Sequence, residues 1–138
     1  MIFETTLSET VWLSVQAVKT DFKASKGVEA SFSNCNLSNT DWYESNLNNA
    51  RFRDCKLTGA NFLHASVNGL TFGRCKLNSA FLRGFCFKKV TLENLDFSEA
   101  DLDDADFRNT IFVGCSLRGT CFEGADLRSC DLGQISLS

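Results

Sequence analysis

Large apolar residues recur at every fifth position of this chain, and no other feature of the sequence constrains the fold as strongly. Steps of five from Ile2 to Leu137 give 28 positions, and 26 of them hold Ile, Leu, Val, Phe or Trp. We call each such residue the centre of its five-residue unit. The residue two places before a centre is Ala, Ser, Thr or Cys at 21 of 27 positions, and we call this the small position. The chain is therefore one continuous repeat, which has to be interpreted before any local motif.

A period of five residues is incompatible with a helix or a straight strand. Centres would spread around a helix, which advances about 100° per residue, and would alternate between the two faces of a strand. The period fits a chain that turns a corner once per unit, so that four units close a coil of about twenty residues. Large centres and small positions then all face the axis. We therefore predict a single all-β domain over residues 1–138, a quadrilateral β-helix (solenoid) of about seven coils.

Residues 1–29 follow the repeat less regularly and allow two interpretations. Leu7 and Phe22 occupy centres, which favours strand-like coils. Leu7, Val11 and later apolar residues also recur every three or four positions, so that residues 6–20 could form a capping helix. We expect irregular coils here and keep the N-terminal cap as the alternative.

Four short strings carry a resemblance to a known family. "ANFLH", "ADLDD", "ADFRN" and "ADLRS" resemble the A-(D/N)-(L/F)-x-x unit of the pentapeptide repeat proteins, most specifically from about Ala30 onward. The resemblance implies a right-handed, four-sided β-helix. It also implies a partner, because the best-understood members bind type II topoisomerases and protect them from inhibitors. Some members are described as DNA mimics.

Composition narrows the classes of partner. The net charge is −3, whereas a surface that binds nucleic acid is normally basic. The segment "MIFETTLSET" has neither the basic nor the apolar region of a signal peptide. No apolar run approaches the roughly 18 residues of a membrane-spanning helix. We therefore expect a protein partner, no direct contact with nucleic acid or membrane, and a cytoplasmic location.

Seven cysteines raise the question of a metal or redox site. Two of them, Cys86 and Cys121, follow a small position by one place. The other five fill small positions: Cys35, Cys55, Cys75, Cys115 and Cys130. A stacked thiolate ladder is one interpretation, and the other is packing, because cysteine behaves as a small apolar residue. The sequence contains no C-x-x-C pair of the kind seen in zinc sites. We expect reduced thiols, no metal and no cofactor.

Residues typical of catalysis are sparse. The single histidine, His64, lies two residues after a centre, at a corner that we expect to face water. A general base needs a partner that orients it and a pocket that shifts its pKa. Glycines such as Gly59 and Gly84 occupy the same corner position, where a turn with positive φ explains them. We therefore expect no catalytic residue and no enzymatic activity, and we look for function on the outer surface.

The negative charge is concentrated on one of the four predicted walls, which we call the acidic wall. It consists of the units centred on Ile2, Phe22, Trp42, Phe62, Leu82, Leu102 and Phe122. Eight acids and two bases give this wall a net charge of −6, while the other three walls carry +1, 0 and +2. The candidate binding residues are Asp41, Glu44, Asp101, Asp103, Asp104 and Glu123. The alternative is an ordinary solvated face, because turn positions favour Asp, Asn and Glu.

The acidic wall leaves two functions open. The first is a protein-binding scaffold whose partner the sequence does not identify. The second is a DNA mimic that binds a type II topoisomerase such as DNA gyrase. Duplex DNA carries about one charge per 1.7 Å, and coils stacked about 4.8 Å apart form a rod of roughly 33 Å. Eight acids give less than half the charge density of DNA, so we favour the scaffold.

Two other surfaces could contact a partner. Large residues such as Phe85 and Val90 fill small positions near residues 81–95, and Phe81 precedes a centre. Phe81, Phe85 and Val90 either form an exposed apolar contact or fill a locally widened coil. The open end of a β-helix is an unpaired edge that can join another chain. A homodimer through a coil end is therefore a further option.

Overall fold

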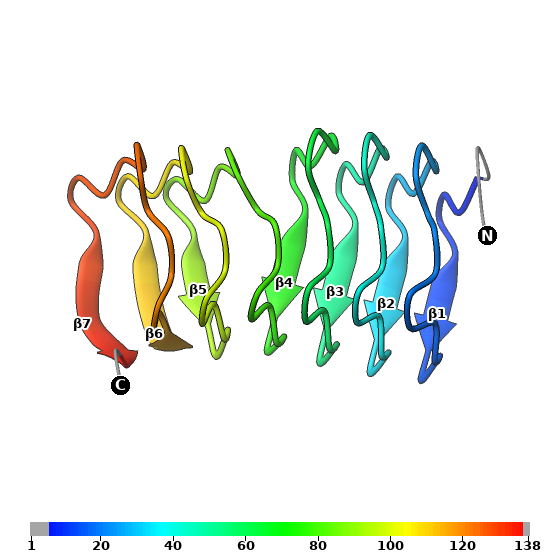
Figure 1. Ribbon diagram of the computed structural model, residues 1–138, viewed down its shortest axis with the longest axis horizontal. Coiled ribbons are helices and arrows are strands. Elements are labelled where there is room, and N and C mark those ends of the chain that lie inside the picture. The colour runs from blue at the N-terminus through cyan, green and yellow to red at the C-terminus, as the bar shows by residue number, and fades with distance from the viewer. Residues whose placement is uncertain (1–5, 137–138) are drawn as a thin grey trace.

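The computed structural model describes residues 6–136, which form a solenoid of stacked parallel strands (Figure 1). This range contains no helix, and hence none that could cross a membrane. The strands are β1 (Val11–Leu13), β2 (Ser31–Ser33), β3 (Arg51–Arg53), β4 (Thr71–Gly73), β5 (Thr91–Glu93), β6 (Ile111–Ser116) and β7 (Asp131–Ser136). Each strand begins twenty residues after the previous one, and the chain makes about six turns. The all-β solenoid predicted from the period is confirmed.

Residue pairing shows that each coil has four sides. On the wall that carries the strands, Phe32 pairs with Phe52 in parallel register. On the other three walls, single bridges also join residues twenty apart, as between Asp41 and Asn61 on the acidic wall. Four five-residue units therefore complete one coil, and residues twenty apart stack in columns.

Stacked aromatic centres fill much of the interior. The rings of Phe22 and Trp42 lie 4.2 Å apart, with 8° between their planes. Phe32 and Phe52 stack at 4.8 Å, and Phe32 also meets Trp42 edge to face at 5.6 Å. The side chains at the small positions also face the interior and let the four walls approach one another. Ala50, at one of these positions, has no exposed surface. The narrow core is therefore packed from all four sides.

The corners depend on backbone conformations that most residues avoid. Among the described residues, the second residue after a centre has a positive φ in 25 units, and six of these 25 residues are glycines. Gly84 has a φ of +76°, and a Cβ atom there would meet no heavy atom within 4 Å. At this position glycine is favoured for its backbone freedom and not for lack of space. The turn explanation of the corner glycines is confirmed.

The N-terminal segment continues the solenoid in the residues that the structure describes. β1 pairs with β2, and Thr6 and Gln16 bridge to Lys26 and Asn36 on other walls. The capping helix considered for residues 6–20 is not formed. Glu4, counted on the acidic wall, lies outside the described residues.

Burial of the centres stops before the last coil. Leu127 and Leu132 are 36% and 41% exposed, and Phe122 is half-buried. A centre is fully covered only when coils lie on both of its sides, and no described coil follows these residues. The repeat predicts that the centres from Phe32 to Leu132 are buried. This prediction is wrong for Leu127 and Leu132, and Val67 and Phe122 are only half-buried.

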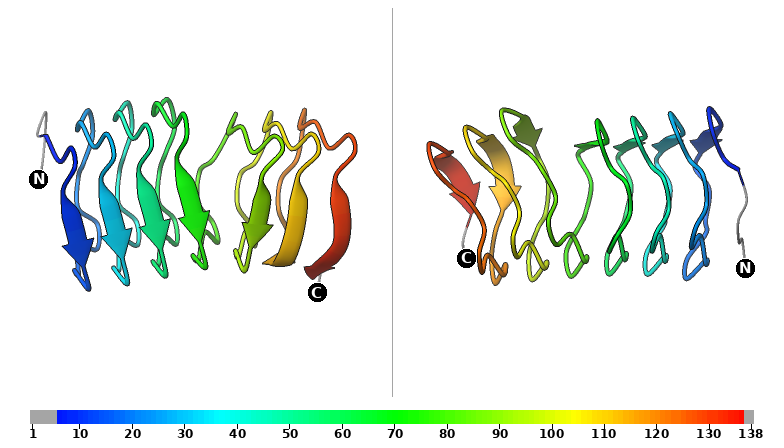
Figure 2. Two further views of the ribbon diagram at one scale, coloured as in Figure 1. Left: turned by 180° about the vertical axis from the view of Figure 1, so that it is seen from behind. Right: turned by 90° about the horizontal axis from the view of Figure 1, so that it is seen from above.

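The hydrogen-bonded ladder is interrupted in the middle of the stack. Strands β1 to β4 form one sheet and β5 to β7 form another, with no pairing between β4 and β5. The ribbons separate at this point in the views of Figures 1 and 2. Ser66 and Cys86 also lack the bridge expected on the preceding wall, whereas Asn61 still pairs with Phe81 on the acidic wall. The coils are therefore open along two adjacent walls and joined along the others.

Candidate protein-binding surfaces

The densest acidic cluster surrounds Asp101 on the acidic wall. Its Oδ1 accepts a hydrogen bond from the Asp103 backbone N–H at 3.0 Å, and its Oδ2 lies 3.0 Å from the Arg83 guanidinium. Asp103 Oδ2 lies 3.7 Å from the same guanidinium. Asp103 Oδ1 accepts the Glu123 backbone N–H at 2.8 Å. Asp101 and Asp103 therefore hold adjacent turns in place, and one arginine neutralises about half of their combined charge.

Asp104 and Glu123 are the outward-facing acids of this cluster. Both are exposed, and neither forms an ion pair with another described residue. Together with Arg83 and Asp103 they line a shallow surface hollow of about 240 Å³. These two carboxylates are the groups most available to a basic partner.

A second acidic cluster lies nearer the N-terminus. Lys23 Nζ lies 3.7 Å from Asp21 Oδ2 and 3.9 Å from Asp41 Oδ2. Asp41 Oδ1 also accepts the Tyr43 backbone N–H at 3.0 Å. Glu44 is exposed and forms no ion pair among the described residues. The sequence thus located the clusters, but only the side-chain geometry shows that each contains its own neutralising base.

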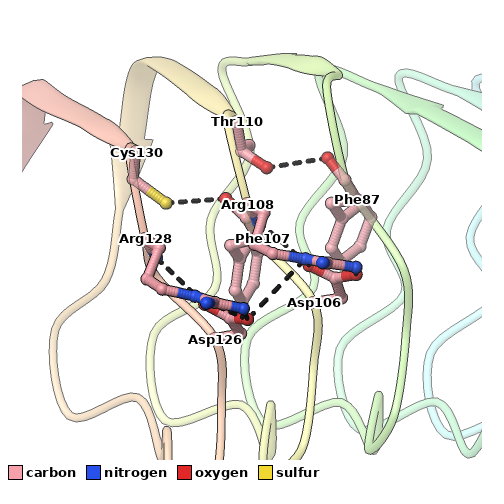
Figure 3. Close-up of polar contacts among 8 residues, drawn as sticks. All are labelled: Phe87, Asp106, Phe107, Arg108, Thr110, Asp126, Arg128 and Cys130. Atoms are coloured by element: carbon pink, nitrogen blue, oxygen red, sulfur yellow. Dashed lines mark hydrogen bonds and ion pairs between the residues drawn. The ribbon is translucent and has the colours of Figure 1, made fainter.

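Opposite charges form an ion-pair ladder on the wall next to the acidic wall. This ladder was not among the features predicted from the sequence. Arg108 lies 2.7 Å from Asp106 and 3.6 Å from Asp126, and Arg128 lies 2.6 Å from Asp126 (Figure 3). Hydrogen bonds from the Arg108 side chain and backbone lower the pKa of Asp106 to about 2. The repeated strings "DFR" and "DLR", twenty residues apart, were a usable signal. Because the charges cancel, this ladder joins coils and leaves no net field for a partner.

The cysteines lie where the repeat placed them. All seven are free. Cys75 donates to the Phe52 carbonyl oxygen at 3.2 Å, and the partly buried Cys130 donates to that of Phe107 (Figure 3). Burial raises the pKa of Cys35 and Cys115. The described residues contain no group of three His, Cys, Asp or Glu side chains that could hold a metal ion. Cys35 and Cys115 are therefore thiols that pack in the interior.

The proposed apolar contact is not one surface. Phe85 is only 4% exposed, and its ring lies 5.9 Å from that of Phe62 and 6.1 Å from that of Phe72. Phe85 is therefore an interior residue, which agrees with the alternative of a locally widened coil and not with an exposed contact. Phe81 and Val90 are 44% and 40% exposed, but they lie on opposite walls of their coil and cannot form one patch.

Comparison with known proteins identifies the family. A sequence model described as a pentapeptide repeat region matches residues 25–95. A second, described as pentapeptide repeats in eight copies, matches residues 95–134. The chain is a pentapeptide repeat protein. No curated protein matches it.

Solved structures place this pentapeptide repeat protein near a known resistance factor in fold. Two structures of trypsin-treated variants of QnrB1, a plasmid-mediated fluoroquinolone resistance protein, match 97% of the chain. One gives a TM-score of 0.62 at 19% identity and is covered over 75% of its length. The other gives 0.54 at 18% identity and is covered over 77%. At this identity the likeness shows the fold.

The outer surface of the pentapeptide repeat protein offers little for catalysis. His64 is exposed at a corner with a φ of 59°, and its ring meets that of Tyr43 edge-on at 5.4 Å. No carboxylate is among its contacts in the described residues. A general base needs such an orienting partner, which the described residues do not give His64.

Proposed function

We propose that this pentapeptide repeat protein is a non-enzymatic scaffold that binds another protein through its acidic wall. The observation that carries the proposal is the exposed pair Asp104 and Glu123, at the edge of a cluster that Arg83 only partly neutralises. The partner would present a complementary basic surface, because opposite potentials accelerate association and suppress other partners. Seven free cysteines support a reducing compartment, which we propose to be the cytoplasm.

A second candidate function is DNA mimicry toward a type II topoisomerase such as DNA gyrase. The fold shared with a fluoroquinolone resistance protein favours it. The charge geometry favours it less: of the seven acids of this wall that the structure describes, four pair with Lys23 or Arg83. About six turns at roughly 4.8 Å would face about 17 charges on DNA. We therefore rank the scaffold first and gyrase binding second.

The test compares variants that change charge on different walls. Asp104→Asn combined with Glu123→Gln removes the two exposed acids, and asparagine tolerates the positive φ of 59° at residue 104. The matched control is Glu29→Gln with Glu99→Gln, two exposed turn acids on other walls with φ values of 61° and 57°. Both double variants change the net charge by the same amount.

Each protein is immobilised, partners are captured from a bacterial lysate, and association rates are measured with the captured partner at several salt concentrations. We expect the acidic-wall variant to associate more slowly and to lose salt dependence, while the control behaves as wild type. Equal effects of both variants would overturn the acidic wall as the binding surface. Binding of purified DNA gyrase that duplex DNA displaces would establish the second candidate in place of the first.

A further inference from the structure

Backbone hydrogen-bonding groups are unpaired where the solenoid opens between residues 66–73 and 86–93, a feature that we call the β4–β5 opening. One coil earlier, Leu47 and Asn49 donate to carbonyl oxygens of the next coil at 2.7 and 2.8 Å. Their equivalents, Val67 and Gly69, make no such bond among the described residues. The missing acceptors are the carbonyl oxygens of residues 86 and 88.

The facing side of the opening is unpaired in the same way. Ser66 and Thr71 donate backward to the preceding coil at 2.8 and 3.0 Å, but their equivalents Cys86 and Thr91 do not. These four donors and the four carbonyl oxygens that they would reach face the gap, which one backbone hydrogen bond still crosses, from the Arg74 N–H to the Glu93 carbonyl oxygen at 3.4 Å. Backbone groups in folded proteins are nearly always paired with protein, water or ligand, so these groups are open to hydrogen bonds from water or from a ligand.

The opening contains a cavity of about 340 Å³. Its walls are mainly apolar, with Leu70, Phe72, Phe87, Val90 and Leu92 among the lining residues. A cavity of about 150 Å³ with such walls holds one benzene molecule. The volume here suits about two rings or a medium-length acyl chain, and it falls within the usual range for small-ligand sites.

The charge at the opening favours a negatively charged ligand. Lys88 is exposed and is the one charged residue that lines the cavity, and no acid lines it. The unpaired N–H groups add donors and the unpaired carbonyl oxygens add as many acceptors, so the charge preference comes from Lys88. A carboxylate could bind Lys88 together with the free N–H groups, whereas an ammonium group would meet Lys88 unfavourably.

We propose that the β4–β5 opening is a binding site for a small apolar carboxylate, such as a medium-chain fatty acid. Its apolar part would lie among Leu70, Phe72 and Phe87. Its carboxylate would lie at the mouth of the cavity, on Lys88 and the free amide groups. This site is separate from the acidic wall, and the proposal stands independently of the protein-binding function.

Decanoate is the probe, titrated into ¹⁵N-labelled protein and followed by the backbone amide signals. We expect saturable binding with the largest shifts at Val67, Gly69, Cys86 and Thr91. The paired amides one coil earlier should shift little. Shifts concentrated at the coil ends, or a response that does not saturate, would overturn the proposal.

Lys88→Gln removes the charge at the mouth, and Lys89→Gln is its control, since Lys89 is also exposed but does not line the cavity. Loss of a charged hydrogen bond should weaken decanoate binding about tenfold in Lys88→Gln. Lys89→Gln should change it less than about twofold. Decanol, which has the same chain without the charge, should bind both variants alike. Equal weakening by the two substitutions would show that only the general charge of the protein matters and would refute the assigned site.

Discussion

At the scale of single residues, the fold depends on an inward and an outward position in every unit. Phe62 and His64 belong to the same unit and illustrate the difference. Phe62 is 1% exposed, and its ring lies parallel to that of Trp42 at 6.3 Å. His64 is exposed at the corner. Substitutions of Phe62 and His64 should therefore differ by several kcal/mol in how far they lower the free energy of unfolding.

Phe62→Ala should lower the free energy of unfolding by about 3–5 kcal/mol, because it leaves a cavity in a packed aromatic column. His64→Ala should change it by less than about 0.5 kcal/mol. Denaturant unfolding of both variants gives the two values. A larger loss in His64→Ala would contradict the inward phase assigned to the centres.

Glycine at a corner should matter for its backbone alone. Gly84→Ala should cost about 1 kcal/mol, because alanine is disfavoured at a φ of +76° although its Cβ has room. Gly73, in β4, has no positive φ, and an added Cβ would meet Arg53 Cγ at an ordinary 3.7 Å. Gly73→Ala should therefore be neutral or stabilising by up to about 1 kcal/mol. Thermal unfolding of the pair isolates the effect, and equal losses would point to crowding instead.

At the scale of elements, the solenoid is held by contacts that repeat from coil to coil and weakens where they stop. The ion-pair ladder of Asp106, Arg108, Asp126 and Arg128 joins two coils near the C-terminus. Between β4 and β5 the strands do not pair, and one backbone hydrogen bond remains there, from the Arg74 N–H to the Glu93 carbonyl oxygen at 3.4 Å. Large side chains explain this, since Phe85 occupies the interior where most units have Ala, Ser, Thr or Cys.

The ion-pair ladder predicts that the stability of the protein depends on pH. The pKa of Asp106 is lowered to about 2 in the folded protein, compared with about 3.9 in an unfolded chain. Its contribution to stability is therefore present above about pH 4 and is lost as the pH falls to about 2. The difference in unfolding free energy between wild type and Asp106→Asn should shrink over this interval.

Urea unfolding at several pH values between about 2 and 6 measures that difference. Asp131→Asn is the control, because the Asp131 carboxylate accepts a backbone hydrogen bond from Gly133 but pairs with no described base. Its difference from wild type should vary less with pH. A constant difference for Asp106→Asn would show that the ion pair is too well solvated to contribute.

At the scale of the whole molecule, the interruption divides one stack into two sheets. The stability of a solenoid is close to a sum over its coils and the interfaces between them. A weak interface should therefore let the two parts unfold separately. Both tryptophans, Trp12 and Trp42, lie on the N-terminal side, so their fluorescence reports on that part alone.

Phe112→Ala removes a fully buried ring from β6, on the C-terminal side. It should lower the midpoint of unfolding seen by far-UV circular dichroism and leave the midpoint seen by tryptophan fluorescence nearly unchanged. Phe32→Ala, in β2, is the matched control and should lower the fluorescence midpoint. Coincident shifts of both probes in both variants would mean that the molecule unfolds as one cooperative unit despite the opening.

The five-residue pattern was enough to predict the all-β solenoid, the twenty-residue coil, the inward centres and the corner glycines. Each of these features could be predicted because it depends on the pattern within single five-residue units, which places every large residue on the side that faces the axis of the coil. Only the packing between coils shows which acids pair with Lys23 and Arg83. It also shows that Phe85 is buried and that strand pairing stops between β4 and β5. Such features depend on side chains from neighbouring coils that compete for the same interior volume and the same partners, and no pattern within one coil records that competition.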